Sequence, residues 1–166
     1  MPTDDKMKTK PWESNPRAVP LDSDAYPTDW SQPTFEDRVD AQSARHIEMK
    51  KRAIDFLREQ YISFYRQHPK REPYIETERL WLGSTGNFYL DVVLMDAGQP
   101  AAAIEVGRCA EEKLKDFAKF PLAPEVYHWP YEEEKPLRVV MPWEPGYDPD
   151  RLKFEPVEQV SGEGTE

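Results

Sequence analysis

The residues best suited to chemistry are two carboxylates, Asp91 and Glu105, each set among apolar neighbours within residues 88–107. A carboxylate is costly to bury unless it is paired, hydrogen-bonded or bound to a metal. Two carboxylates in facing strands therefore need a partner, which could be a cation, a hydrogen-bond donor or a metal.

Whether the two carboxylates meet depends on the register of one hairpin. Residues 88–107 indicate two buried β-strands joined by a short turn around Gly98. If Met95 pairs with Ala101 across a five-residue loop, Asp91 faces Glu105 with the Cβ atoms roughly 5 Å apart. A three-residue loop would keep this register, whereas an even-numbered loop would send the two side chains to opposite faces.

The elements around this hairpin are predicted from hydrophobic periodicity. A helix is expected from about Asp40 to His68, and Pro69 ends the element. Its apolar residues follow one stripe of a 3.6-residue wheel, and they are Ile47, Ile54, Leu57, Tyr61, Phe64 and Tyr65. The remaining elements are expected at 74–82 (strand), 108–120 (helix), 124–131 (strand) and 137–141 (strand). The order of helix, three strands, helix and two strands predicts an α/β fold with a small mixed sheet flanked by two helices.

This order, with Asp91 in the second core strand and Glu105 near the end of the third, resembles the PD-(D/E)xK nuclease-like superfamily over about residues 41–141. The resemblance implies a restriction-endonuclease-like αβββαβ core with extended terminal tails. It also implies that Asp91 and Glu105 bind Mg²⁺ or Mn²⁺ beside a scissile phosphate. The metal lowers the pKa of its water while a nearby cation offsets the developing charge.

The family's lysine, two residues after the glutamate, is absent, because Gly107 occupies that position. In some branches of the superfamily this lysine comes from the following helix, and Lys113, at the flank of that helix's apolar stripe, is the best candidate here. Lys115 and Arg108 are weaker ones. The family often adds a glutamate from the first helix, for which two residues off the apolar stripe are available, Glu48 and Glu59.

Charge limits how the protein could meet nucleic acid. The 166 residues carry a net charge of −10, so binding to phosphates requires a local basic patch or a metal. The first helix concentrates positive charge and is the predicted patch, although a solvated helix face would have the same composition. Its cations are Arg45, Lys50, Lys51, Arg52, Arg58 and Arg66.

Three segments are predicted. Residues 1–38 form a proline-rich, acidic tail that is extended or disordered, 39–142 form the single α/β domain, and 143–166 form an acidic C-terminal tail. The first tail could instead dock as a strap or contact a protein partner through its aromatic residues. These are Trp12, Tyr26, Trp30 and Phe35.

Cellular placement follows from what the sequence lacks. A single cysteine, Cys109, rules out an intrachain disulfide, and no apolar run has the roughly 20 residues of a membrane helix. The start of the chain also lacks the apolar core of a signal peptide. We therefore expect a cytoplasmic protein without a membrane partner.

Two functions remain in view. The first is metal-dependent hydrolysis of phosphodiesters by Asp91, Glu105 and Lys113. The second is a catalytically inactive interaction protein on the same fold, an adaptor or a nucleic-acid mimic, which the acidic charge and Gly107 favour. The sequence does not determine the oligomeric state, and a homodimer is compatible with it. It also does not determine the choice between DNA and RNA.

The histidines show no metal-ligand spacing among themselves; they are His46, His68 and His128.

Overall fold

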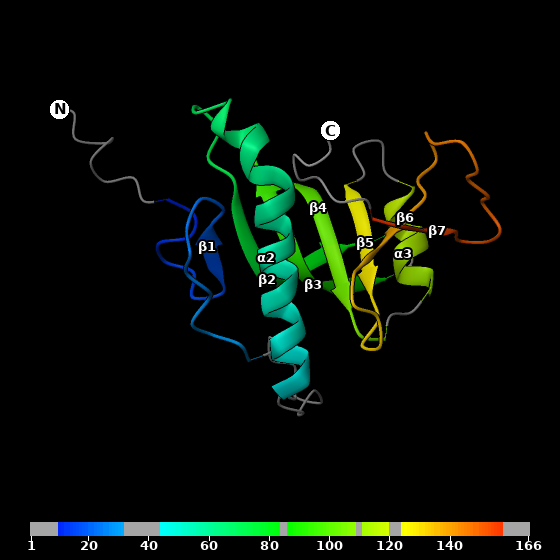
Figure 1. Cartoon of the computed structure of the whole chain (residues 1–166), viewed down its shortest axis with the longest axis horizontal. Coiled ribbons are helices and arrows are strands. Elements are labelled where there is room, and N and C mark those ends of the chain that lie inside the picture. The colour runs from blue at the N-terminus through cyan, green and yellow to red at the C-terminus, as the bar shows by residue number, and fades with distance from the viewer. Residues whose placement is uncertain (1–9, 32–43, 84–85, 109–110, 120–123, 158–166) are drawn as a thin grey trace.

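The structure is a computed structural model that describes residues 10–31, 44–83, 86–108, 111–119 and 124–157. Two helices and seven strands lie in these ranges (Figure 1). In chain order they are β1 (Ala18–Pro20), α2 (Ala44–Arg66), β2 (Tyr74–Leu82), β3 (Asn87–Asp96), β4 (Gln99–Val106), α3 (Glu111–Phe117), β5 (Glu125–Trp129), β6 (Leu137–Val139) and β7 (Phe154–Pro156).

All seven strands belong to one mixed sheet, in which they lie in chain order. Every neighbouring pair is antiparallel except β4 and β5, which are parallel. A parallel pair needs a crossover connection, and α3 lies in that connection. The predicted α/β class, with a mixed sheet and two helices, is confirmed. The sheet is larger than the small one predicted, because short strands on either side of the central region add to it.

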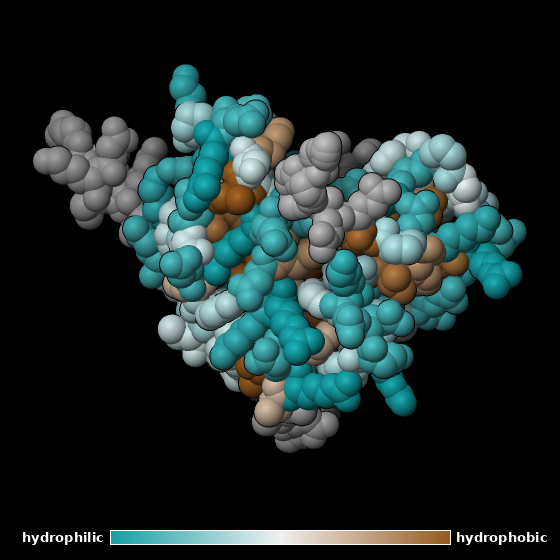
Figure 2. All heavy atoms as spheres, in the orientation of Figure 1, coloured by the Kyte–Doolittle hydropathy of each residue, from teal (hydrophilic) through white to brown (hydrophobic). Residues whose placement is uncertain are grey.

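The two helices cover opposite faces of the sheet. Val92 belongs to the core cluster that contains Leu57 of α2, whereas its neighbour Val93 belongs to the cluster that contains Phe117 of α3. Successive strand residues point to opposite faces, so the two clusters are the two sides of one sheet. Figure 1 shows α2 crossing its face along the middle strands, and Figure 2 shows the outer side of that helix covered largely by hydrophilic atoms.

The packing of α2 follows most of the predicted stripe. The residues buried are Met49, Lys50, Ala53, Ile54, Leu57 and Tyr65. Phe64, which the periodicity also assigned to the stripe, is 49% exposed and stacks on His68 instead. No helix in the part of the chain that the structure describes is long and apolar enough to cross a membrane.

The segments on either side of the central region also pack on the sheet. Strand β1 pairs with the start of β2, and the Trp12 ring lies 6.0 Å from the Tyr74 ring. Tyr26 donates a hydrogen bond to Asp55 of α2 at 2.7 Å. Residues 10–31 thus lie as the strap alternative describes, while Phe35 is outside the described residues. Strand β7 likewise extends the sheet past the predicted boundary at 142.

The turn of the central hairpin differs from the prediction. Met95 pairs with Pro100, not Ala101, and the strands are joined by the two-residue turn 97–98. Both turn residues have positive φ, 55° and 81°, as a type I′ turn requires. The five-residue loop is therefore wrong.

The register beyond the turn is nevertheless the predicted one. Pairing shifts between Leu94 and Met95, so that Leu94 lies opposite Ala102 and Val93 opposite Ala103. A bulge of one residue restores the register that an even-numbered turn would have lost. The paired residues end with Val92 opposite Ile104, and beyond them the backbone N–H of Asp91 donates to Glu105 Oε2 at 3.2 Å.

Candidate functional site

Strand β2 changes the face to which its side chains point, and Glu78 lies at the change. Ile75 packs in the core under α2, whereas Trp81 packs in the core under α3. Residues six apart in a regular strand would share a face. Glu78 has a φ of 55°, in the left-handed region that a residue with a side chain rarely adopts. A conformation of this kind costs on the order of 1–3 kcal/mol and is concentrated at functional sites.

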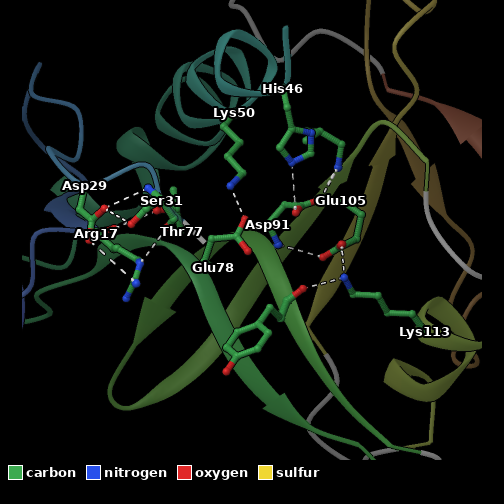
Figure 3. Close-up of polar contacts among 12 residues, drawn as sticks. Arg17, Asp29, Ser31, His46, Lys50, Thr77, Glu78, Asp91, Glu105 and Lys113 are labelled. Atoms are coloured by element: carbon green, nitrogen blue, oxygen red, sulfur yellow. Dashed lines mark hydrogen bonds and ion pairs between the residues drawn. The ribbon is translucent and has the colours of Figure 1, made fainter. Parts of the chain in front are cut away.

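Strand β3 makes the same change at Asp91. Leu90 lies in the α3 core and Val92 in the α2 core, although a regular strand would put both on one face. Thr77 pairs with Val92 and Arg79 with Leu90, so Glu78 and Asp91 lie opposite each other between these pairs. The two carboxylates are thereby brought together at the middle of the sheet (Figure 3).

Helix α2 supplies two groups to this point. Lys50 is completely buried and forms an ion pair with Glu78, which is 7% exposed. Burial raises the pKa of the Glu78 carboxyl, and the charge of Lys50 opposes the rise. One turn earlier in the helix, His46 Nε2 lies 3.6 Å from Asp91 Oδ1.

Asp91 is held as a carboxylate. The backbone N–H of Val106 donates to Asp91 Oδ2 at 2.9 Å. Burial alone would raise the pKa of Asp91, but the contact with His46 and the charges of Lys113 and Lys50 outweigh it, so this pKa is lowered. An ionised carboxylate is the form that binds a metal.

Glu105 has the opposite electrostatic character. It is 1% exposed, and its Oε2 accepts the backbone N–H of Asp91 at 3.2 Å. Lys113 Nζ donates to Glu105 Oε1 at 2.6 Å and to the carbonyl oxygen of Tyr89 at 2.6 Å. Burial and the charge of Asp91 raise the pKa of Glu105 well above its usual value, against the effect of Lys113. Paired groups with pKa values pushed apart are typical of acid and base roles.

The residues that could together hold a metal include two that were not predicted, His46 and Glu78. Ligand atoms of His46, Glu78 and Asp91 all lie within 4.8 Å of one another. Glu105 adjoins this trio through the backbone of Asp91, and it comes with Lys113 from the α3 side (Figure 3). Two carboxylates and an imidazole are a donor set that a divalent cation can use.

The structure thus gathers all three predicted site residues, Asp91, Glu105 and Lys113, into one cluster. The weaker alternatives lie elsewhere. Lys115 Nζ donates to the backbone carbonyl of Asp150 at 3.4 Å, which lies outside the cluster, and Arg108 is exposed. Glu48 and Glu59 are also exposed, and Glu48 pairs with an arginine of its own helix.

Three members of the cluster were not assigned to it from the sequence: His46, Lys50 and Glu78. A signal existed for Lys50, which stands three residues after Ile47 and four before Ile54, on the apolar stripe itself. His46 and Glu78 carry no comparable signal. They join the site only because α2 crosses the sheet over the irregular pair of strands.

Gly107 stands at a position that has no room for a side chain. Its φ is 76°, and a Cβ atom added there would lie 2.6 Å from the Tyr131 ring. A longer side chain at this position would displace the tyrosine. Lys113, from helix α3, places its ammonium on Glu105.

Tyr131 connects the site to the surface. Its hydroxyl lies 2.8 Å from His46 Nδ1, which leaves Nε2 directed at Asp91. Arg45 lies over the tyrosine ring at 4.7 Å and donates to the Tyr131 carbonyl at 3.0 Å. Contacts of this kind fix the orientation of a metal-binding histidine.

The cations predicted to form a phosphate patch on α2 all have partners within the protein. Lys50 is buried on Glu78, and Arg58 donates to backbone carbonyls of residues 20 and 21. Lys51 lies over aromatic rings of residues 10–31. Of the exposed members, Arg45 contacts Tyr131, which in turn contacts His46.

No family model, no curated protein and no solved structure matches this chain. The case for a function therefore rests on the geometry of the cluster.

Proposed function

We propose that this protein is a divalent-cation-dependent phosphodiesterase of nucleic acid, built on a restriction-endonuclease-like core. The observation that carries the proposal is the convergence of Glu78, Asp91 and Glu105 with an imidazole and the Lys113 ammonium, at a point where two strands are distorted. The element order α2, β2, β3, β4, α3, β5 supports the core.

The residues would divide the work as follows. Asp91 is the principal ligand, because it is ionised and its second oxygen is fixed by Val106. His46 adds a nitrogen ligand from α2. The cation, Mg²⁺ or Mn²⁺, would supply a water of lowered pKa and charge stabilisation.

Glu105 and Lys113 act as a unit. The raised pKa of Glu105 suits it to accept a proton from the attacking water, since a base works best when its pKa is near the working pH. Lys113 holds Glu105 in place and brings positive charge beside the phosphate.

Activity tests the proposal directly. Plasmid and single-stranded DNA and RNA are incubated with the protein and Mg²⁺ or Mn²⁺, beside Asp91→Asn and Glu105→Gln. We expect cleavage that either substitution lowers by at least about a hundredfold, the range for losing a positioned acid–base group. Cleavage that is unchanged in both variants comes from a contaminant and refutes the proposal.

A second function is favoured by one observation. Glu78, Asp91 and Glu105 each already have a cationic or backbone partner in the protein, as a purely structural network would. On this reading the chain is an inactive member of the fold that binds a protein partner. Isothermal titration calorimetry separates the two, because Mn²⁺ binding that is lost in Asp91→Asn supports the enzyme, and the absence of Mn²⁺ binding supports the adaptor.

A further inference from the structure

Lys50 is one of the largest completely buried side chains of the described residues, and its position is unusual for a lysine. A buried ammonium costs several kcal/mol of desolvation unless a counter-charge compensates for it. The compensating group is Glu78, whose carboxylate forms an ion pair with Lys50 Nζ. Figure 3 shows the Lys50 side chain extending from α2 toward Glu78, alongside His46.

Glu78 is itself placed at a cost. Its φ of 55° directs the carboxylate out of the regular alternation of β2 and toward Asp91. Two carboxylates so close together repel each other unless a cation lies beside them. The Lys50 ammonium is the positive charge on the Glu78 side, while His46 and Lys113 lie on the other sides of Asp91 and Glu105.

We infer that the Lys50 ammonium stands where one of two divalent cations would otherwise bind, beside Glu78. The site then binds a single divalent cation, and the charge of Lys50 replaces the other. Centres that bind two divalent cations hold them roughly 3.5–4 Å apart between shared carboxylates. Here Asp91 lies between Glu78 and Glu105 and would be the shared ligand. The inference rests on the cation site of the proposed function, but not on phosphodiester chemistry.

The variant Lys50→Met tests this by removing the charge and keeping much of the volume. Mn²⁺ binding is measured by calorimetry, and the bound ion is observed by electron paramagnetic resonance. We expect one bound Mn²⁺ in the wild type and two in Lys50→Met, with the broadened spectrum of a coupled pair. The same stoichiometry and affinity in both proteins would overturn the inference.

Thermal unfolding gives an independent measurement. In EDTA, Lys50→Met should unfold at a lower temperature than the wild type, because Glu78 is left buried without a counter-charge. Saturating Mn²⁺ should raise the midpoint of Lys50→Met more than that of the wild type, since a ligand that binds only the folded state stabilises it. An equal rise in both proteins counts against the inference.

Two further variants complete the design. Lys51→Met removes the neighbouring charge of the same helix, and should bind Mn²⁺ as the wild type does. Lys50→Met/Glu78→Gln removes both buried charges, and should fold and bind one Mn²⁺. If Lys50→Met fails to fold even with Mn²⁺ while the double variant folds, a divalent cation does not replace the ammonium and the inference is wrong.

Failure of the proposed function is distinguishable from failure of this inference. A wild type without cleavage that depends on Asp91 refutes the enzyme, whatever Lys50→Met binds. The inference concerns only the extra cation that Lys50→Met gains over the wild type.

Discussion

Replacing Lys113 with methionine should destabilise the protein by an amount that depends on pH. Lys113 Nζ lies 2.6 Å from Glu105 Oε1, with side-chain exposures of 15% and 1%. Removing one partner of a buried ion pair costs about 3–5 kcal/mol, because the other charge is left uncompensated. Since Lys113 keeps some exposure, we expect a loss of about 3 kcal/mol at pH 8.

The loss should shrink as the pH falls, because Glu105 can escape the penalty by taking up a proton. Its pKa is already raised in the native protein, and losing the lysine raises it further. Between the native pKa of Glu105 in the wild type and its higher pKa in the variant, each fall of one pH unit reduces the difference in unfolding free energy by about 1.4 kcal/mol. At pH 5 the variant should therefore lie much closer to the wild type than at pH 8.

Urea unfolding followed by tryptophan fluorescence measures both values. Lys115→Met is the matched control, because Lys115 is a lysine of the same helix whose hydrogen bond, to the Asp150 carbonyl, is exposed. It should change the free energy of unfolding by no more than about 0.5 kcal/mol. Lys113→Met/Glu105→Gln should regain most of the loss at pH 8. A loss in Lys113→Met that is the same at both pH values would refute the idea that a buried charge causes it.

The remaining predictions concern the rest of the site and the core. The wild type should lose stability as the pH rises above about 4.5, because the raised native pKa of Glu105 means that the folded state binds the proton more tightly than the unfolded state. Glu105→Gln should abolish this loss. Urea unfolding at several pH values measures the pH dependence, and the same dependence in both proteins contradicts the prediction. Gly107→Ala should cost about 1–3 kcal/mol in the same assay, from the positive φ and the contact with the Tyr131 ring, and full stability would show that the ring moves away freely. Tyr131→Phe should weaken Mn²⁺ binding about tenfold in calorimetry by releasing His46, with no more than about 1.5 kcal/mol lost in stability; unchanged affinity would remove Tyr131 from the site. Leu57→Ala should cost about 2–5 kcal/mol as a completely buried core residue of α2, and a loss below 1 kcal/mol would contradict the described packing.

Much of the architecture could be predicted from local sequence. The strand at 74–82 has the predicted bounds, and the long helix, 44–66, falls within the predicted 40–68. Periodicity and proline positions determine these elements because they act over a few residues. The register of Val92 against Ile104 was also predictable, although by a different turn, because burial of alternate apolar residues fixes which face each side chain takes.

The make-up of the site depended on tertiary structure. Lys113 could be anticipated from its place at the flank of the apolar stripe of its helix, and its ammonium contacts Glu105. The roles of His46 and Glu78 could not be anticipated, because no local pattern encodes a positive φ in mid-strand or the angle at which α2 crosses the sheet. Local sequence is enough to locate the two carboxylates, Asp91 and Glu105, and the strands that carry them. Only the fold decided that Glu78, His46 and Lys50 join them, because desolvation and charge act between residues that are distant in the chain and meet only when the helix packs on the sheet.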